Sequence, residues 1–566
     1  MKESITSGPR KKSLLTTLAC SAFALAFAAG PARAQTAADK PVAPAPGAPV
    51  DPAAAPPPPV VAAPAPTPEP LPPPPASPPP SPLPAPAWEP LPTGAAAPEG
   101  YAHPLTEVPA NLVEAGWFAR MPLKVQFGKD KQAWAFTLFG TIQADYIFDT
   151  TRSYNDFIGQ SLVARDDTYE GTTGRTQFGM RNSRIGFLLD SPAIGSVTPS
   201  AVFQLDFAGN QPSVPYVPPG SPGSAGISEN AYYNNPTARI RHAYLTLRNP
   251  IVDILAGQTF DVFGWQNFYA PCALLGVPNQ LSSRSAQLRL SKSIGAGGPV
   301  VVDIAFAAAR PVQRDSRVPD LEGGIRLSIP GWKGITTPGN AVTIAAPLSI
   351  GVSGITRQFY VNAFTPPPAQ RSNSTVGWGV SGDVFIPVIP AKHAGDRGNR
   401  MTLVGSFVYG TGIADMIVSG GGARFPTLPN PGQASPPPQY TPDVDNGLVT
   451  FDVRGVLHTI DWWAAKGAFQ YYFPGSGRIF LAGNFTYAHS RNIGKLYPAG
   501  GTEIELLGSI ADRSLSGDAS LLFDATPAIR FGISGMYTQV RYLRNSASPE
   551  QEPHNIRGIA QALYTF

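Results

Sequence analysis

Apolar and polar residues alternate with a period of two along most of the chain after about residue 134. The clearest run is Phe136–Asp149. One of its faces carries aromatic, aliphatic and small residues, and the other carries Thr, Gln and Asp together with Phe139 and Ile147. Alternation over about ten positions is typical of a strand that crosses a membrane in a barrel, with one face toward lipid and the other toward water. A soluble sandwich would instead bury the apolar face against a second sheet.

The alternation predicts an all-β fold: a transmembrane antiparallel up-and-down β-barrel of about sixteen strands. Besides Phe136–Asp149 and a closing run Gly558–Phe566, the regular runs are Ala201–Ala208, Gln287–Lys292, Val300–Ala309, Ile325–Ile329, Trp378–Ile386, Met401–Tyr409, Arg478–Ala488, Ser514–Asp524 and Ala528–Tyr542. The less regular runs are Met180–Asp190, Ala238–Arg248, Ile251–Thr259, Leu348–Arg357 and Thr459–Phe473. Leu448–Leu457 also has strand character, so about eighteen strands is the alternative.

The links between these runs alternate between long and short. Thr150–Gln177 and Gly209–Thr237 are long, whereas Ser191–Val197 and Asn249-Pro250 are short. An up-and-down outer-membrane barrel needs this rhythm, because it has long extracellular loops and short periplasmic turns. Two links, Pro330–Pro347 and Pro387–Asn399, are long for periplasmic turns. The alternation of long and short links supports the strand assignment least at these two places.

The last residues predict the strand that closes the barrel. Phe566, Tyr564 and the small residues before them share a face without a polar side chain, whereas Arg557 and Gln561 lie on the other. The expected partner across the closure is Phe136–Asp149. We therefore expect Phe566 to meet lipid or the periplasmic interface, and Arg557 to point inward.

The N-terminus has the pattern of a secretory signal peptide over residues 1–34. A basic start precedes the apolar stretch Leu14–Ala29, and Ala32-Arg33-Ala34 has the spacing of a cleavage site. Cys20 would leave with this peptide. Cys272 would then be the only mature cysteine, so an intramolecular disulfide is excluded.

Residues 35–98 are almost entirely Pro and Ala, with too few large apolar residues for a core. Such a segment is expected to be disordered, with polyproline II character, in the periplasm. It is either a plain spacer or an arm that contacts peptidoglycan. Residues 99–133 form a short segment before the barrel, in which 109–118 could be a short helix, and 134–566 form the outer-membrane barrel.

Arginines dominate the predicted interior of the barrel. On the assigned parity, the pore-lining set is Arg184, Arg239, Arg241, Arg289, Arg326, Arg530 and Arg557. A guanidinium stays charged and forks onto carboxylate or phosphate, so this set favours anions. Inward carboxylates at Asp145, Asp206, Asp303, Asp383 and Asp518, and a net charge of only +4, also fit a weakly selective pore.

The link after the run Ile251–Thr259 carries no charge between Asp261 and Arg284. A loop this apolar is costly in water, so it is expected to be buried inside the barrel or at a subunit interface. Its aromatic residues, the candidates for a pore constriction, are Phe263, Trp265, Phe268 and Tyr269.

Several segments, in their order along the chain, resemble the trimeric outer-membrane porins and, among them, the DcaP-like transporters. They are Phe139–Asp149, Ser183–Phe187, Arg239–Leu245, Ala256–Phe260, Pro319–Leu321 with Arg326, and Tyr409–Ile413. The resemblance implies a sixteen-stranded homotrimer, a third extracellular loop that narrows the pore, and passive uptake of small anionic nutrients such as dicarboxylates. The Pro/Ala-rich arm and the uncharged constriction loop depart from the family pattern.

The sequence thus predicts a diffusion porin of a Gram-negative outer membrane, with small anionic solutes and membrane lipid as its partners. The alternatives are a structural or adhesive barrel tethered by the arm, and a barrel enzyme. We expect no enzyme activity, because no recognisable Ser–His pairing is present. No metal cluster, cofactor-binding loop or nucleic-acid motif stands out in the sequence.

Overall fold

The computed structural model describes residues 123–128, 134–159, 161–209, 237–266, 268–312, 316–365, 369–393, 395–419, 444, 447–451, 456–496, 510–544 and 549–566. All of them lie in Tyr101–Phe566, which belongs to one compact unit. The predicted signal peptide, the Pro/Ala-rich segment and the short helix at 109–118 lie outside the described residues.

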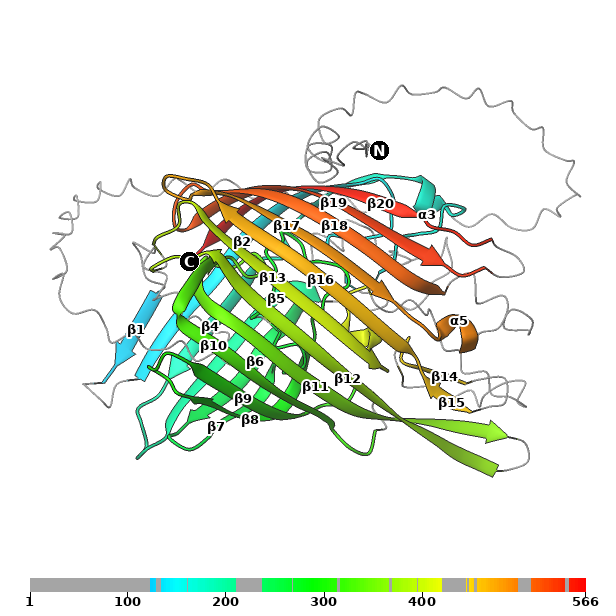
Figure 1. Cartoon of the computed structure of the whole chain (residues 1–566), viewed down its shortest axis with the longest axis horizontal. Coiled ribbons are helices and arrows are strands. Elements are labelled where there is room, and N and C mark those ends of the chain that lie inside the picture. The colour runs from blue at the N-terminus through cyan, green and yellow to red at the C-terminus, as the bar shows by residue number, and fades with distance from the viewer. Residues whose placement is uncertain are drawn as a thin grey trace, which may run out of the picture. The chain divides into compact units, whose positions relative to one another are not determined.

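Within the described residues, sixteen antiparallel strands form a closed barrel (Figure 1). They are β2 (Trp134–Asp149), β4 (Arg184–Asp190), β5 (Thr198–Gly209), β6 (Thr237–Arg248), β7 (Asp253–Phe260), β8 (Arg284–Ile294), β9 (Val301–Ala309), β10 (Asp320–Thr336), β11 (Ile344–Thr365), β12 (Ala369–Ile389), β13 (Arg400–Thr411), β16 (Asp461–Tyr472), β17 (Ile479–His489), β18 (Ala511–Asp524), β19 (Ile529–Tyr542) and β20 (His554–Thr565). Each pairs with its neighbour in chain order, and β20 pairs with β2. All sixteen correspond to predicted runs, although β10, β11 and β12 are longer than predicted.

The segment Leu448–Leu457 does not add strands to the wall. Its residues contribute to β14 (Val449–Phe451) and β15 (Leu457–Thr459), which pair with each other in a separate two-stranded sheet. The alternative of eighteen wall strands is therefore excluded. The short helices within the described ranges are α3 (Tyr169–Thr172), α5 (Ile493–Leu496) and the 3-10 turn η2 (Ala414–Met416). Among the described residues, no helix is long and apolar enough to span a membrane.

One wall strand is interrupted. The run predicted from Met180 begins only at Arg184, and a separate strand β3 (Arg175–Gly179) pairs with the distal part of β2. Between them, the Arg181 side chain donates to Asp156 at 2.8 Å and to the carbonyl oxygens of Phe207 and Gly209 at 3.1 Å. These bonds fix the break between β3 and β4.

The closure of the barrel is formed by β2 and β20, with Ile147 opposite Ile559 and Thr141 opposite Thr565. The backbones of Gly140 and Phe566 exchange hydrogen bonds of 3.0 and 3.1 Å. A further strand, β1 (Leu123–Phe127), pairs with Trp134–Leu138 and so continues the line of β20 beyond Phe566. The predicted closing strand and its partner are confirmed.

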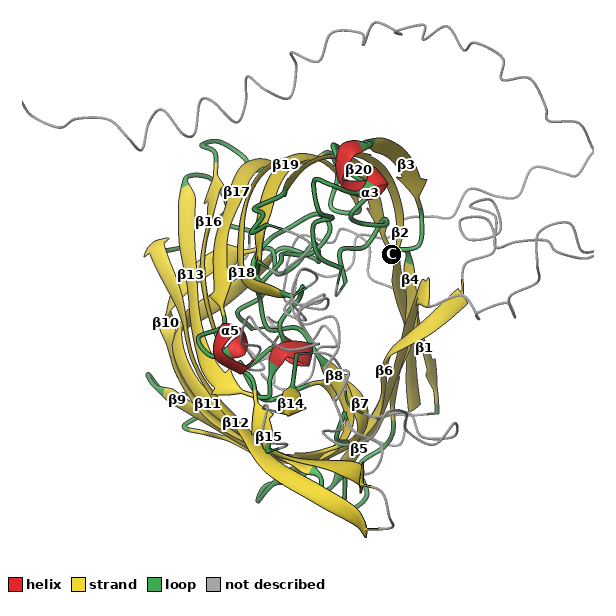
Figure 2. Cartoon of the chain, turned by 90° about the vertical axis from the view of Figure 1, so that its right-hand side faces the viewer, coloured by secondary structure: helices red, strands yellow, loops and turns green. Residues whose placement is uncertain are grey.

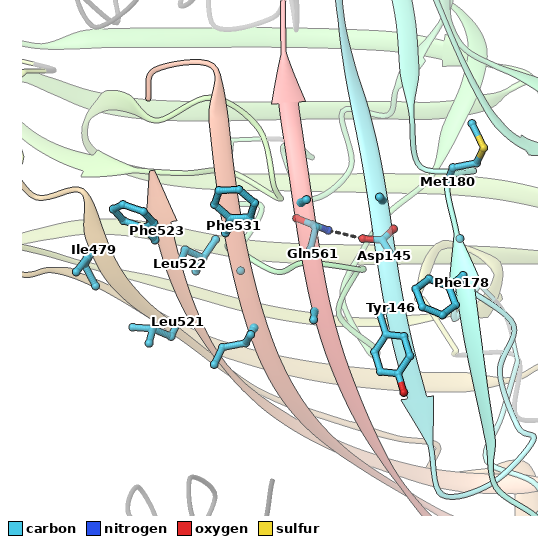
Figure 3. A pocket seen from close by; sticks show the side chains of 16 residues that line it. Asp145, Tyr146, Phe178, Met180, Ile479, Leu521, Leu522, Phe523, Phe531 and Gln561 are labelled. Atoms are coloured by element: carbon cyan, nitrogen blue, oxygen red, sulfur yellow. Dashed lines mark hydrogen bonds between the residues drawn. The ribbon is translucent and has the colours of Figure 1, made fainter. Parts of the chain in front are cut away.

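The two faces of this seam have opposite character. Outward residues such as Tyr146 and Tyr564 are exposed, whereas Asp145, Arg557 and Gln561 are buried inside. Figure 3 shows Gln561 donating to Asp145 across the seam, at 2.8 Å, while the rings of Tyr146 and Phe178 lie on the outer side. Arg557 lies on the inner side, where its guanidinium donates to the Asp149 carboxylate.

Gly140 offers a test of the seam. An added Cβ would lie 2.5 Å from the Arg184 carbonyl oxygen and 2.6 Å from the Phe566 ring. We expect Gly140→Ala to destabilise the barrel by about 1–3 kcal/mol through overpacking. The measurement is the urea midpoint of the heat-modifiable band on gels. The control is Gly558→Ala on the same seam, where a Cβ meets nothing within 4 Å. Equal midpoints for the two variants would contradict the assigned packing.

Candidate functional site: the barrel interior

The interior is crossed by the link between β7 and β8, residues 261–283, here named the inner loop. Figure 2 shows loops, drawn green, inside the ring of strands. The inner loop leaves the wall beside β8 and reaches the opposite side, where Asn484 of β17 donates to the Cys272 carbonyl oxygen at 2.9 Å and Gln561 of β20 donates to that of Leu274 at 3.3 Å. The sequence left two locations open for this loop, the inside of the barrel and a subunit interface. The structure has it inside the barrel.

The aromatic residues of the inner loop are seated on glycines of the wall. The Trp265 ring lies where side chains of Gly324 on β10 and Gly351 on β11 would be, within 2.9 Å of their ideal Cβ positions. The Phe263 ring lies in the same way 2.8 Å from the Cβ position of Gly379 on β12. These inward glycines form a seat for the loop. The sequence analysis did not predict this glycine seat. The period-two alternation places these glycines on the inward faces of their strands, and that pattern could have indicated the seat.

Polar groups of the wall hold the start of the inner loop. The Glu322 carboxylate accepts the backbone N–H groups of Val262 at 2.7 Å and Phe263 at 3.1 Å. Ser353 Oγ accepts the N–H of Gly264 at 2.6 Å. Trp265 has a φ of 40°, which a bulky residue rarely adopts. Its ring is buried, and its indole N–H donates to the Val352 carbonyl oxygen at 3.2 Å. Packing and hydrogen bonds therefore impose this conformation.

The tip of the inner loop packs on a second apolar surface. Cys272, Leu274 and Leu275 are buried against inward residues of β16, β17, β18, β20 and β2, including Phe480 and Ile559. The loop is thus anchored at both ends of its crossing. Its lack of charge follows, because a charged side chain in either contact would be buried without water.

The four candidate constriction aromatics do not all face open space. Phe263, Trp265 and Tyr269 are at most 2% exposed, and Phe268 is partly buried with the Arg326 guanidinium 3.8 Å from its ring centre. They fasten the loop to the wall. The part that crosses the interior is formed by the residues that follow them, up to Leu275.

Most of the predicted pore-lining arginines are buried in contacts with acidic or amide side chains. Arg326 pairs with Asp303 at 2.8 Å, Arg530 with Asp524 at 2.6 Å, and Arg557 with Asp149 at 2.8 Å. Arg289 donates to Gln287 at 2.9 Å and to the Phe260 carbonyl oxygen. Parity placed these side chains inside but did not reveal their partners, because cross-strand pairing depends on register.

Two of the other three arginines donate to one carboxylate, and the third lies opposite it in the ladder. Asp206 on β5 lies opposite Arg184 on β4 and opposite Arg239 on β6. Arg239 donates to it at 2.7 Å and Arg241 at 3.0 Å. Two guanidiniums on one carboxylate leave a local excess of positive charge. Arg239, Arg241 and Asp206, with Arg184 opposite Asp206 in the ladder, are here named the basic cluster. The Arg239 side chain is 41% exposed, so water reaches the cluster.

A β-bulge explains why both arginines of β6 join the cluster. Gln204 lies opposite His242 and Leu205 opposite Ile240, so Arg241 is an extra residue in the ladder. The bulge shifts the parity of the strand, and Arg239, Arg241, His242 and Tyr244 all point inward. The sequence alternation could not decide this parity, because it assumes an unbroken period of two.

The barrel as a whole resembles solved outer-membrane channels. It is similar to the outer membrane channel DcaP of Acinetobacter baumannii, with a TM-score of 0.50 and 15% identity over 79% of this chain and 100% of that chain. The fold is DcaP-like. The resemblance drawn from the sequence motifs is thus confirmed at the level of the fold.

Two other solved barrels are less similar. OmpF of Salmonella typhi in complex with daunomycin has a TM-score of 0.43 and 10% identity over 78% of this chain and 100% of that chain. The anion-selective porin from Comamonas acidovorans has a TM-score of 0.41 and 8% identity over 76% and 100%. No family model matches the chain, and no curated protein matches it. Among the described residues, no cluster of His, Cys, Asp or Glu could hold a metal ion.

Cys272 reports on the anchoring of the inner loop, because its side chain is only 1% exposed. Trp265→Ala would remove about 3–5 kcal/mol of packing from the glycine seat and loosen the loop. We expect this variant to react with a maleimide several-fold faster than the parent, measured by mass spectrometry of the folded protein. Trp378→Ala, which removes an outward and exposed indole, is the control. Equal rates in both variants would show that the seat does not hold the loop.

Proposed function

We propose that this protein is an outer-membrane porin for the passive diffusion of small hydrophilic solutes, with a preference for anions. The observation that carries the proposal is the basic cluster, in which Arg239 and Arg241 of β6 both donate to Asp206 of β5, while Arg184 of β4 lies opposite Asp206 in the ladder. An excess of guanidinium groups at an accessible position inside a barrel replaces part of an anion's hydration and repels cations.

The other arginines of the interior are buried with partners, so ion selectivity would depend mainly on the basic cluster. Arg326 and Arg557 each have an acidic partner at 2.8 Å, so each pair contributes little net charge. Arg530 shares Asp524 with Arg397, and both of these arginine side chains are less than 10% exposed, so their charge is buried. The inner loop fills the side of the interior next to β10–β13 and β16–β20. Solutes would therefore pass along the wall that carries the basic cluster.

Small dicarboxylates fit this arrangement as substrates, since adjacent guanidiniums can each fork onto a carboxylate.

We further propose a homotrimer in the outer membrane of a Gram-negative bacterium. The family resemblance supports the trimer, and the outward apolar residues, such as Ile142, Tyr146 and Phe148, support contact with lipid. The arm at residues 35–98 would extend into the periplasm, with peptidoglycan as a candidate partner.

Reversal potentials in planar bilayers test the anion preference. In a potassium chloride gradient, the parent is expected to favour chloride, and Arg239→Gln is expected to lower the chloride-to-potassium permeability ratio by roughly two-fold or more. Arg239 is the variant of choice because its exposed guanidinium can be removed with little loss of packing.

The control is Arg491→Gln, which removes an arginine of the link after β17. Its side chain is 55% exposed and lies 3.7 Å from Asp461, the first residue of β16. This variant should leave the ratio unchanged. A cation-selective parent would refute the anion preference while leaving the porin intact. A folded parent without conductance would refute the porin and favour a structural or adhesive barrel.

Chemical cross-linking of the detergent-extracted protein tests the assembly. A cross-linked band at three times the monomer mass that survives boiling is expected for a homotrimer. A single monomer band at saturating cross-linker would contradict it.

A further inference from the structure

The turn between β10 and β11, residues 337–343, folds into the barrel from the end that holds Phe566. It is here named the inturned turn. Because strand directions alternate, this end also holds the turns 191–197, 249–252 and 525–528. The turn 191–197 has the same length but projects outward, with Ile194 73% exposed. The length of the inturned turn therefore does not explain why it folds inward.

Side chains of three wall strands hold the inturned turn on one side of the barrel. On β16, Gln470 accepts the Thr337 N–H, and the Tyr472 hydroxyl contacts Thr337 Oγ1, both at 2.8 Å. On β19, Arg530 donates to the Ala341 carbonyl oxygen at 2.8 Å and to Thr343 Oγ1 at 3.1 Å. On β20, Gln561 accepts a hydrogen bond from the Asn340 amide.

The inturned turn also reaches the opposite side. Val342 packs against an apolar cluster of inward residues from β2, β5, β6 and β7. The cluster consists of Phe139, Val202, Tyr244 and Leu255. The turn is thus in contact with strands on both sides of the barrel, and it spans the interior near the terminal end.

The inturned turn and the inner loop are joined in the middle of the interior. Gly339 donates to the Pro271 carbonyl oxygen at 3.1 Å and accepts the Ala273 N–H at 2.7 Å. These bonds make a parallel bridge between Cys272 and Gly339. Two segments that enter from opposite ends of the barrel therefore form one continuous obstruction.

From this geometry we propose that the inturned turn sets the upper size limit for solutes, together with the inner loop. The proposal rests on the porin function proposed above. The residues that determine the limit are Asn340 and Val342, because their side chains tie the turn to β20 and to the β5–β7 wall. A solute that passes the basic cluster must still pass this turn before it leaves the terminal end.

The test replaces residues 338–342 with Asn-Gly. Thr336 lies opposite Ile344, so a two-residue hairpin between Thr337 and Thr343 preserves the register of β10 and β11. The variant is expected to show a single-channel conductance roughly two-fold higher than the parent, and to admit larger neutral sugars in liposome swelling. The control carries Asn-Gly in place of residues 193–197 in the outward turn, and it should behave as the parent.

A second variant, Val342→Gly, keeps the length of the turn and should give a smaller rise in conductance. Heat-modifiable mobility shows which variants are folded. An unchanged conductance and sugar limit in the folded variants overturns the proposal. A silent parent with a conducting hairpin variant supports the turn as the obstruction but refutes the proposed porin function, whereas silence in both overturns both proposals.

Discussion

Backbone pairing between β2 and β20 is the constraint on which the rest of this barrel depends. Lipid offers no hydrogen-bond partners, so an open edge at membrane depth would leave a row of unpaired N–H and C=O groups. The chain meets this requirement with its last residues, since the backbones of Phe566 and Gly140 are paired. Gly140 is required there because the Phe566 ring occupies the space of a side chain. The closure in turn fixes which residues point inward along both strands, including Asp145, Arg557 and Gln561.

The interior that this closure defines is not uniformly wet. On the side of β9–β13 and β16–β20, it has apolar clusters and buried ion pairs like those of a protein core. Burying an ion pair is costly in free energy unless its geometry is good, and Arg326–Asp303 and Arg557–Asp149 both have two short hydrogen bonds. These pairs fix loops and strands in place. The accessible positive charge lies instead on β6, where Arg239 and Arg241 share the Asp206 carboxylate and Arg239 is exposed.

The inner loop and the inturned turn explain two features that stood out in the sequence. The loop lacks charge because both ends of its crossing pack against apolar walls or glycine backbone. The link predicted at Pro330–Pro347 looked long because β10 and β11 extend into it, and the residues left between them, 337–343, fold into the barrel, where Gly339 meets Cys272. The sequence alone showed each segment as an irregularity. Their contact gives both a common role in narrowing the interior.

The sequence by itself determined the barrel, its sixteen strands, the closing pair and the inward side of most strands, because a period of two is a local property of the backbone. The register between strands, the bulge at Arg241 and the paths of the interior loops were decided only by the tertiary structure. These features depend on partners far apart along the chain, such as Glu322 for Val262 and Gln561 for Asn340. Parity predicted that seven arginines point inward, but it could not reveal the bulge that lets both Arg239 and Arg241 do so. Only the tertiary structure showed that the shared carboxylate Asp206 has an exposed arginine, Arg239, whereas the arginines that hold the wall together are buried.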